Sequence, residues 1–143
     1  MGDAQTPPTV SSQALDTWLQ SGQYKSWHCE TAAHTPRDPS PHKDQNRICS
    51  NDLLSAAGAN EYPVGAANVK ELIRNGQVVG HAVYVKDAPG KTGDTFFWYE
   101  TVDGSVAVMG HGNTGAPKSI CVDCHSNAGP AHFGHDFVFT QVK

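Results

Sequence analysis

The chain has 143 residues and a formal net charge of −4, and this length suits one domain rather than two. Its Lys and Arg residues are few and scattered, so no basic face for nucleic acid is expected. No apolar run approaches the length of a membrane span, and the N-terminal segment has neither a basic start nor an apolar stretch. The sequence predicts a flexible, Pro-rich tail over residues 1–10 and a single domain over residues 11–143, with no membrane span.

The domain is predicted to begin with a short helix. Ser11 or Ser12 can cap it, and it is expected to end near residues 21–22. Its apolar side chains recur at helical spacing and are predicted to be core: Ala14, Leu15, Trp18 and Leu19. Residues 24–30 are predicted to form a strand, and the Pro-rich residues 35–41 form a loop that cannot join a central sheet and is long enough to be functional.

A second strand is predicted over residues 47–51, and residues 52–57 follow as a short helix with Asn51 as its cap. Asn75-Gly76 then separates two alternating runs, residues 67–74 and 77–86. An Asn-Gly pair in this setting is the preferred two-residue hairpin turn.

The second arm of that hairpin has apolar residues on both faces. Val79, His81, Val83 and Val85 alternate with Val78, Ala82 and Tyr84. A strand of this kind is expected to be covered on both sides and therefore central in its sheet.

The remaining elements are also mostly β. An aromatic strand over residues 96–102, an Asp103-Gly104 turn and a partner strand over residues 105–109 form a second predicted hairpin. A glycine-rich connection over residues 110–117 and a short helical turn at residues 121–125 follow, and residues 136–142 are predicted to close the chain as a strand. The fold class is α+β with mostly antiparallel β-structure.

The most specific motif is Cys121-Val-Asp-Cys124-His125, because Cys-x-x-Cys-His is the pattern that attaches haem covalently. The two thiols add across the haem vinyl groups, and the adjacent histidine binds iron. The sequence predicts one haem c with Cys121 and Cys124 as attachment sites and His125 as the iron ligand.

Two other readings of a Cys-x-x-Cys pair are weaker here. A structural zinc site needs a second pair of ligands at similar spacing, and Cys29 and Cys49 do not form one. A redox dithiol lies at a strand-to-helix junction of a βαβ unit, and no alternation of strands and long helices precedes Cys121.

Covalent haem attachment in bacteria occurs outside the cytoplasmic membrane, so we expect a periplasmic or otherwise exported protein whose targeting segment has been removed. An oxidising compartment allows a Cys29–Cys49 disulfide, which is the favoured prediction. The alternative is that one of these two cysteines is a thiolate ligand to the iron, opposite His125.

The chain resembles the cytochrome P-460 family, which includes the cytochromes c′-beta. The resemblance extends over nearly the whole domain and rests on these features: Tyr24-Lys-Ser-Trp27, Asn46-Arg47, Gly65-Ala-Ala-Asn-Val-Lys-Glu-Leu72, the aromatic strand around Trp98-Tyr99, the haem motif, and Asp136-Phe-Val-Phe139. It implies an antiparallel sheet curved around one haem with a few short helices, usually in a homodimer, with His125 as proximal ligand and a distal face that is often vacant.

Two further site residues follow from the resemblance. Hydroxylamine-oxidising members have a lysine bonded to the haem macrocycle, and Lys70 stands at the matching position. Arg47 matches an arginine near the haem, where its guanidinium could pair with a propionate. The structural alternatives for Lys70 are a solvent-facing strand lysine or a partner of Glu71 or another carboxylate, and the alternative for Arg47 is a surface strand arginine.

The sixth iron position could be closed from several places that have no counterpart in the hydroxylamine enzymes. The candidates are His42 and His111 in loops and Met109, the one internal methionine. Each is more often a polar loop residue or an apolar core residue. His81 is expected to be a satisfied core histidine, and His132 and His135 to lie near the haem edge without binding iron.

The favoured function is electron transfer with a redox partner protein, binding of a small nitrogen ligand such as nitric oxide, or both. The alternative is a hydroxylamine-oxidising enzyme with Lys70 and Arg47 at its site, which also needs a base for the substrate protons. Glu71, Glu100 and Asp94 are candidates for that base, and the sequence does not distinguish among them.

Overall fold

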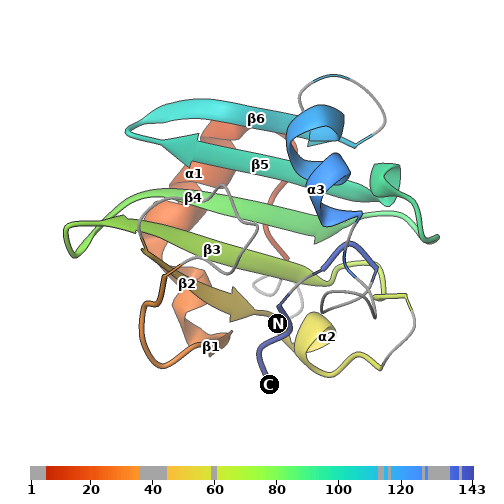
Figure 1. Ribbon diagram of the computed structural model, residues 1–143, viewed down its shortest axis with the longest axis horizontal. Helices are drawn as coiled ribbons and strands as arrows, with labels where there is room; N and C mark the ends of the chain where they lie inside the picture. The colour runs from red at the N-terminus through yellow and green to blue at the C-terminus, as the bar shows by residue number, and fades with distance from the viewer. Residues whose placement is uncertain are drawn as a thin grey trace.

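One open antiparallel sheet forms the body of the protein (Figure 1). The structure is a computed structural model that describes residues 6–35, 45–58, 61–112, 115, 117–126, 128, 136–138 and 140–143. Its six strands lie side by side in the order of the chain: β1 (His28–Cys29), β2 (Gln45–Ser50), β3 (Ala67–Arg74), β4 (Gln77–Lys86), β5 (Phe96–Val102) and β6 (Ser105–His111). The predicted fold class, α+β with mostly antiparallel strands, is confirmed.

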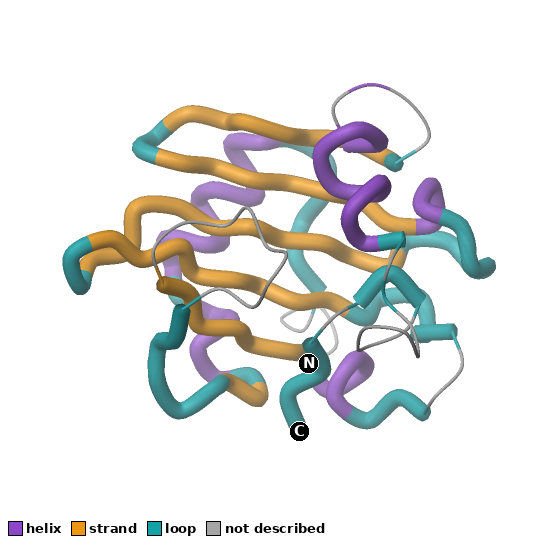
Figure 2. Tube along the Cα trace, in the orientation of Figure 1, coloured by secondary structure: helices purple, strands orange, loops and turns teal. Residues whose placement is uncertain are grey.

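The helical elements are short and lie on both faces and at the ends of the sheet. They are α1 (Ser12–Ser21), η2 (Gln23–Ser26), α2 (Asp52–Ser55), η3 (Gly93–Thr95), η4 (Pro117–Val122) and α3 (Asp123–His125). Figure 2 shows α1 behind the sheet and α3 in front of it. We call these the α1 face and the α3 face.

The first helix begins and ends where the sequence predicts. The backbone N–H of Ala14 donates to Ser11 Oγ at 3.0 Å, and Gly22 ends the helix with a φ of 74°. Leu15, Trp18 and Leu19 are buried. The predicted Asn51 cap is also confirmed, because its side chain accepts from the backbone N–H of Leu54 at the start of α2.

Both predicted hairpins are confirmed. Asn75 and Gly76 have φ values of 52° and 76°, and Asp103 and Gly104 have values of 51° and 81°. Positive φ at both central residues defines the tight turn whose twist matches the strands that it joins. The strand after Asp103-Gly104 continues beyond the predicted residue 109 to His111.

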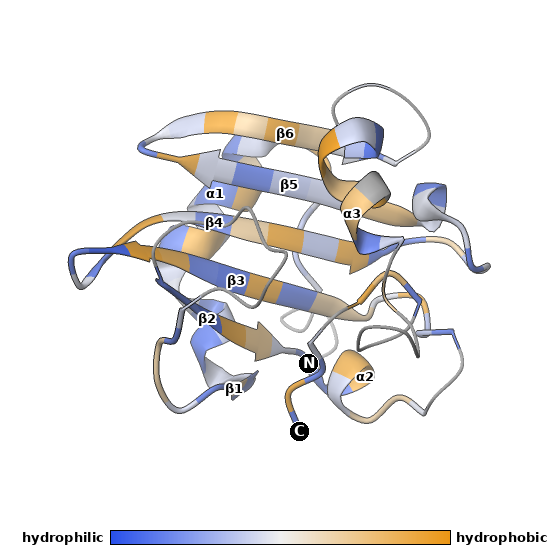
Figure 3. Cartoon of the chain, in the orientation of Figure 1, coloured by the Kyte–Doolittle hydropathy of each residue, from blue (hydrophilic) through white to orange (hydrophobic). Residues whose placement is uncertain are grey.

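The sheet is covered on both faces, and β4 is an interior strand, as predicted. On the α1 face, a cluster of α1 and strand residues includes Val83, Val85, Phe97 and Tyr99. On the α3 face, a second cluster includes Leu54, Tyr84, Phe96, Trp98, Val108 and Val138. Figure 3 shows hydrophilic positions among the apolar ones of β3 and β5.

The prediction of a strand over residues 24–30 is wrong for most of its length. Residues Gln23–Ser26 form the 3₁₀ turn η2, and only His28 and Cys29 pair with β2. After Gly22 the backbone keeps turning, because Lys25 N donates to Gly22 O and Trp27 N to Tyr24 O. Tyr24 and Trp27 are thereby brought against Trp18, with ring centroids 6.2 and 5.6 Å from it.

The prediction of a closing strand over residues 136–142 is also wrong. Asp136 and Phe137 have positive φ values of 45° and 63°, which are incompatible with extended backbone. Side chains rather than a strand ladder hold the segment. Asn68 Nδ2 donates to Thr140 O at 2.7 Å, and Val142 N donates to Ser50 Oγ at 3.0 Å.

The predicted tail and the predicted Pro-rich loop lie largely outside the described residues. Residues 1–5 and 36–44 lie outside the described residues, so the predicted tail is seen only from Thr6 and the Pro-rich loop only at Thr35; Pro7 is buried. Within the described ranges, no helix is long and apolar enough to cross a membrane.

Candidate functional site

The Cys-Val-Asp-Cys-His segment lies on two consecutive helical elements. Cys121 and Val122 end η4, and α3 holds Cys124 and His125. In Figure 1 this segment lies in front of β5, on the opposite side of the sheet from α1. The predicted helical turn is confirmed, and it places both thiols and the imidazole within one short stretch of chain.

Two glycines hold Val122 in place. A Cβ atom at Gly93 would overlap the methyl groups of Val122, and a Cβ atom at Gly112 would overlap both Val122 and the carbonyl of Gly93. Trp98 Nε1 donates to Gly93 O at 3.2 Å, which fixes the position of η3 against β5. The middle of the Cys-x-x-Cys-His segment is therefore docked in a space that only glycines leave open.

His125 is buried and oriented. Its exposed fraction is 8%, and its ring packs edge-on against Trp98 and Tyr84, with centroid distances of 4.9 and 5.4 Å. Nδ1 lies 2.6 Å from the backbone carbonyl oxygen of Phe137. A carbonyl can only accept, so Nδ1 carries the proton and the lone pair is on Nε2, which is the usual state of a metal-binding histidine.

The two thiols are not joined to each other or to another cysteine. Cys121 and Cys124 are both partly buried, and Cys121 packs against the aromatic cluster of the α3 face. Burial raises the pKa of the Cys121 thiol to about 12, with Glu100 and then Cys124 adding to the effect. Cys121 is thus a neutral thiol facing apolar side chains.

Lys70 lies on the same face of the sheet as the Cys-x-x-Cys-His segment. The strand register places five residues in one row across the sheet: Ile48, Lys70, Ala82, Glu100 and Val108. The neighbouring row on that face contains Tyr84 and Trp98, which touch His125. Side chains two residues apart on a strand share a face, so the structure brings Lys70 and Glu100 to the α3 face.

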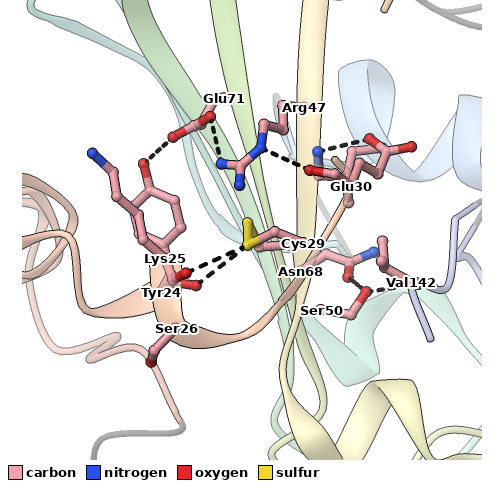
Figure 4. Close-up of a disulfide and its surroundings, with 12 residues drawn as sticks. Tyr24, Lys25, Ser26, Cys29, Glu30, Arg47, Ser50, Asn68, Glu71 and Val142 are labelled. Atoms are coloured by element: carbon pink, nitrogen blue, oxygen red, sulfur yellow. Dashed lines mark hydrogen bonds and ion pairs between the residues drawn. A yellow bond between two sulfur atoms is a disulfide. The ribbon is translucent and has the colours of Figure 1, made fainter. Parts of the chain in front are cut away.

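Arg47 lies on the other face. The register places it opposite Glu71, which is opposite His81. Figure 4 shows its guanidinium between two acidic residues: Nη1 is 3.3 Å from Glu71 Oε1, and Nε donates to Glu30 O at 2.8 Å. The structure does not bring Arg47 together with Lys70 and His125, because neighbouring strand positions alternate between faces.

A buried polar cluster surrounds Glu71 on this α1 face. Tyr24 Oη donates to Glu71 Oε2 at 2.6 Å and lies 3.1 Å from His81 Nε2. Burial, followed by the Glu71 carboxylate, raises the pKa of Tyr24. Burial also lowers the pKa of His81, against the opposing effect of Glu71. His81 is 5% exposed and is a satisfied core histidine, as expected, while Glu71 is separated from the motif by the sheet.

Cys29 and Cys49 form a disulfide, which confirms the favoured prediction (Figure 4). Cys49 belongs to the cluster of the α1 face and Cys29 packs against it. The alternative that one of them is a thiolate ligand opposite His125 is therefore wrong, because both sulfur atoms are in the disulfide and lie on the other side of the sheet.

The other candidates for the sixth iron position divide into two groups. Met109 packs on the α1 cluster, and His111 contacts Phe97 and Asp87. Their register partners, Tyr99 and Phe97, are α1-face residues, so neither reaches the motif. His42, His132 and His135 lie outside the described residues. Asp94, a candidate base, lies in η3 and accepts from Thr92 Oγ1.

Several residues that shape the site were missed at the sequence level. Gly93 and Gly112 hold the motif, and Phe137 supplies the carbonyl for His125. Lys86 is fully buried and pairs with Asp136, 2.7 Å away. A lysine at the end of a strand and single glycines in loops carry no specific signal, whereas Asp136-Phe137 was noticed only as part of a resemblance.

The donor set fits haem c. Two thiols outside any disulfide stand three residues apart, the following histidine has its lone pair on Nε2, and aromatic rings line the face that carries them. Among the described residues, no group of three or more His, Cys, Asp and Glu side chains is arranged to hold a metal ion. No protein-family model, curated protein or solved structure matches the chain.

Proposed function

We propose that this protein is a mono-haem c-type cytochrome of the P-460 and c′-beta kind, with His125 as proximal ligand, that binds nitric oxide or a similar small nitrogen species and exchanges electrons with a partner protein. The observation that carries the proposal is the oriented His125 imidazole beside two unpaired thiols. A hydrogen bond from Nδ1 to a backbone carbonyl fixes the tautomer and ring orientation of a metal-binding histidine.

The residues of the site have separate roles in this proposal. Cys121 and Cys124 bind the macrocycle covalently, and His125 Nε2 binds iron. Bound haem would supply the one-electron redox chemistry and an iron to which a small ligand could bind. Trp98 and Tyr84 exclude water from the histidine side, and burial of this kind is one of the factors that tune a haem potential.

The placement of the other potential ligands supports an open sixth position. Cys29, Cys49, Met109 and His111 all belong to the α1 face or its edge. Of the candidates from the described part of the chain, none lies on the face of His125. An accessible iron distinguishes a gas-binding cytochrome from a purely electron-transferring one with two protein ligands.

Absorption spectra test this function. The ferric and ferrous protein should be high-spin and should change on addition of carbon monoxide or nitric oxide. Met109→Leu and His111→Gln should leave both spectra unchanged, because these side chains are on the other side of the sheet. Low-spin spectra in both states that ignore carbon monoxide would contradict the open position.

Hydroxylamine oxidation is the second candidate, and the position of Lys70 favours it. Lys70 and Glu100 lie in one row on the α3 face, separated by Ala82 of β4. Lys70 shares this face with the two thiols that would hold the macrocycle, and the Glu100 carboxylate on the same face is a suitable proton acceptor. Glu71 and Arg47 lie on the opposite face and carry no role in this candidate.

A cross-link test separates the two functions. If Lys70 is bonded to the haem, the ferrous Soret band is displaced far to the red, and Lys70→Ala removes the displacement while covalent haem remains. Lys91, which lies in the connection after β4, provides the control variant Lys91→Ala. An unshifted Soret band in the wild type, with no turnover of hydroxylamine, excludes the enzyme.

The compartment belongs to the same proposal. A disulfide between Cys29 and Cys49 supports an oxidising environment such as the periplasm, where haem c attachment also takes place. A homodimer and a redox partner protein remain predictions, which sedimentation of the haem-loaded protein and the salt dependence of electron transfer can test.

A further inference from the structure

A buried ion pair lies next to the carbonyl group that orients His125. Lys86, the last residue of β4, has an exposed fraction of 0% for its side chain, and Asp136 has 2%. Lys86 Nζ lies 2.7 Å from Asp136 Oδ2, donates to the carbonyl of Gly90, and is 4.8 Å from the centre of the Phe96 ring. Both charges are therefore fully enclosed by the protein.

Burial of this pair is not explained by stability alone. Removing two charges from water costs free energy that their attraction only partly returns, and apolar residues often replace such pairs without loss. The Oδ1 atom of Asp136 is buried and has no hydrogen-bond partner in the described part of the chain. Because the pair is present despite this cost, its role is to hold a part of the chain in position rather than to increase net stability.

The pair holds backbone in an unfavourable conformation. Asp136 and Phe137 both have φ values in the left-handed region, 45° and 63°, which is costly for residues with a Cβ atom. Asp136 Oδ2 accepts from Lys86 Nζ and also from the backbone N–H of Tyr62, each at 2.7 Å. Two donors from distant parts of the chain thus fix the carboxylate that begins this turn.

The residue after Asp136 supplies the backbone carbonyl that accepts a hydrogen bond from the histidine. Phe137 O accepts from His125 Nδ1 at 2.6 Å. The Phe137 ring packs on Phe96, with centroids 6.3 Å apart, and Val138 is fully buried. Hence the direction of this carbonyl is set on one side by the ion pair and on the other by the aromatic cluster.

We propose that the Lys86–Asp136 ion pair is a positioning device for the proximal histidine, which holds the Phe137 carbonyl against His125 Nδ1 and so strengthens His125 as a donor to iron. The inference rests on the proposed haem function. A hydrogen bond from Nδ1 raises the basicity of the ligand at Nε2, and a stronger donor stabilises ferric over ferrous iron. Lys86 and Asp136 touch neither iron nor substrate, so they are positioning residues.

The test uses the haem-loaded protein and a matched control. Asp136→Asn removes the charge and keeps a side-chain oxygen for the Tyr62 N–H, and asparagine tolerates positive φ. The control is Asp103→Asn: Asp103 also has positive φ, 51°, and pairs with a cation, Arg74, at 2.9 Å, but it is exposed and far along the sheet from the motif. Lys86→Met/Asp136→Asn is the second variant, which leaves no unpaired buried charge if the single variant fails to fold.

The measurements are the iron–histidine stretching band and the midpoint potential. In Asp136→Asn or in the double variant, the band should move to lower frequency, and the one-electron equilibrium should move about tenfold toward ferrous iron, which is about 59 mV more positive. Asp103→Asn should change neither. An unchanged band and potential in a variant with full covalent haem would show that the pair only anchors the chain. Failure of the proposed function is a separate result, because wild-type protein would then carry no covalent haem.

Discussion

At the scale of single residues, the alternation of side chains along β3 separates two kinds of chemistry. Lys70 lies on the face that carries His125, and its neighbour Glu71 lies on the opposite face with Tyr24 and His81. The alternation could be predicted from the sequence, since the boundaries of β3 were correct. The face that holds the Cys-x-x-Cys-His segment could not, because it depends on how the chain returns after β6. Arg47 was expected near a haem only through the family resemblance, and Lys86 was not noticed because a lysine at the end of a strand carries no specific signal.

The polar cluster around His81 makes stability depend on pH. Burial lowers the pKa of His81, so the folded protein binds fewer protons there than the unfolded chain. As the pH falls below about 6.5, the ordinary pKa of histidine, wild-type protein should lose stability relative to His81→Gln. The slope of the difference should be no more than about 1.4 kcal/mol per pH unit.

Urea denaturation of both proteins between pH 5 and pH 8, at constant ionic strength, measures this difference. His111→Gln is a suitable control, because His111 is exposed. A difference between wild type and His81→Gln that does not vary with pH would contradict the lowered pKa.

At the scale of elements, local signals predict the hairpins well and the ends of the domain poorly. Asn75-Gly76 and Asp103-Gly104 adopt the positive φ values that their turns require. Residues 24–30 alternate like a strand, but the backbone after Gly22 turns and packs Tyr24 and Trp27 on α1. Residues 136–142 also look like a strand, yet two left-handed residues bend the chain toward His125. In both places tertiary contacts override the local pattern.

The packing of the Cys-x-x-Cys-His segment against Gly93 can be tested by substitution of this glycine. Gly93→Ala would place a Cβ atom against the methyl groups of Val122, and overpacking of this kind costs roughly 1–3 kcal/mol. In the haem-free protein, alkylation of Cys121 should also become faster, because the segment is pushed away from the aromatic cluster. Urea denaturation and thiol labelling measure the two effects.

A double variant sharpens the result. Val122→Ala removes the overlapping methyl groups, so Gly93→Ala/Val122→Ala should lose less stability than the sum of the two single changes. Gly58→Ala is the control, since a Cβ atom there would have no neighbour within 4 Å among the residues that the structure describes. Additive losses would mean that Val122 does not occupy the space left by Gly93.

At the scale of the whole molecule, the sheet divides the protein into a structural half and a chemical half. The α1 face carries the disulfide, the Glu71 cluster and the remaining ligand candidates of the described chain, whereas the α3 face carries the thiols, His125, Lys70 and Glu100. The strand order follows the chain order, and the sequence was sufficient to predict the fold class and the two hairpins within that order. The distribution of these side chains between the two faces depends on how the sheet is packed, and no local sequence pattern shows it.

The disulfide should stabilise the structural half. Cys29 and Cys49 are 20 residues apart in sequence, and closing a loop of this size is worth about 3 kcal/mol in the unfolded chain. Cys29→Ser/Cys49→Ser should therefore lower the free energy of unfolding by about this amount and still attach haem. In wild-type protein, alkylation should reach these two residues only after reduction, and labelling without a reductant would contradict the disulfide.

The central claim, covalent haem at Cys121 and Cys124, is tested most directly by intact mass spectrometry of protein exported from cells with a haem c maturation system. Wild-type protein and Cys29→Ser/Cys49→Ser should each carry the mass of one haem after acid and organic extraction, and Cys121→Ser/Cys124→Ser should carry none. A wild-type mass equal to that of the polypeptide alone, from cells that attach haem to a control cytochrome, would contradict the account.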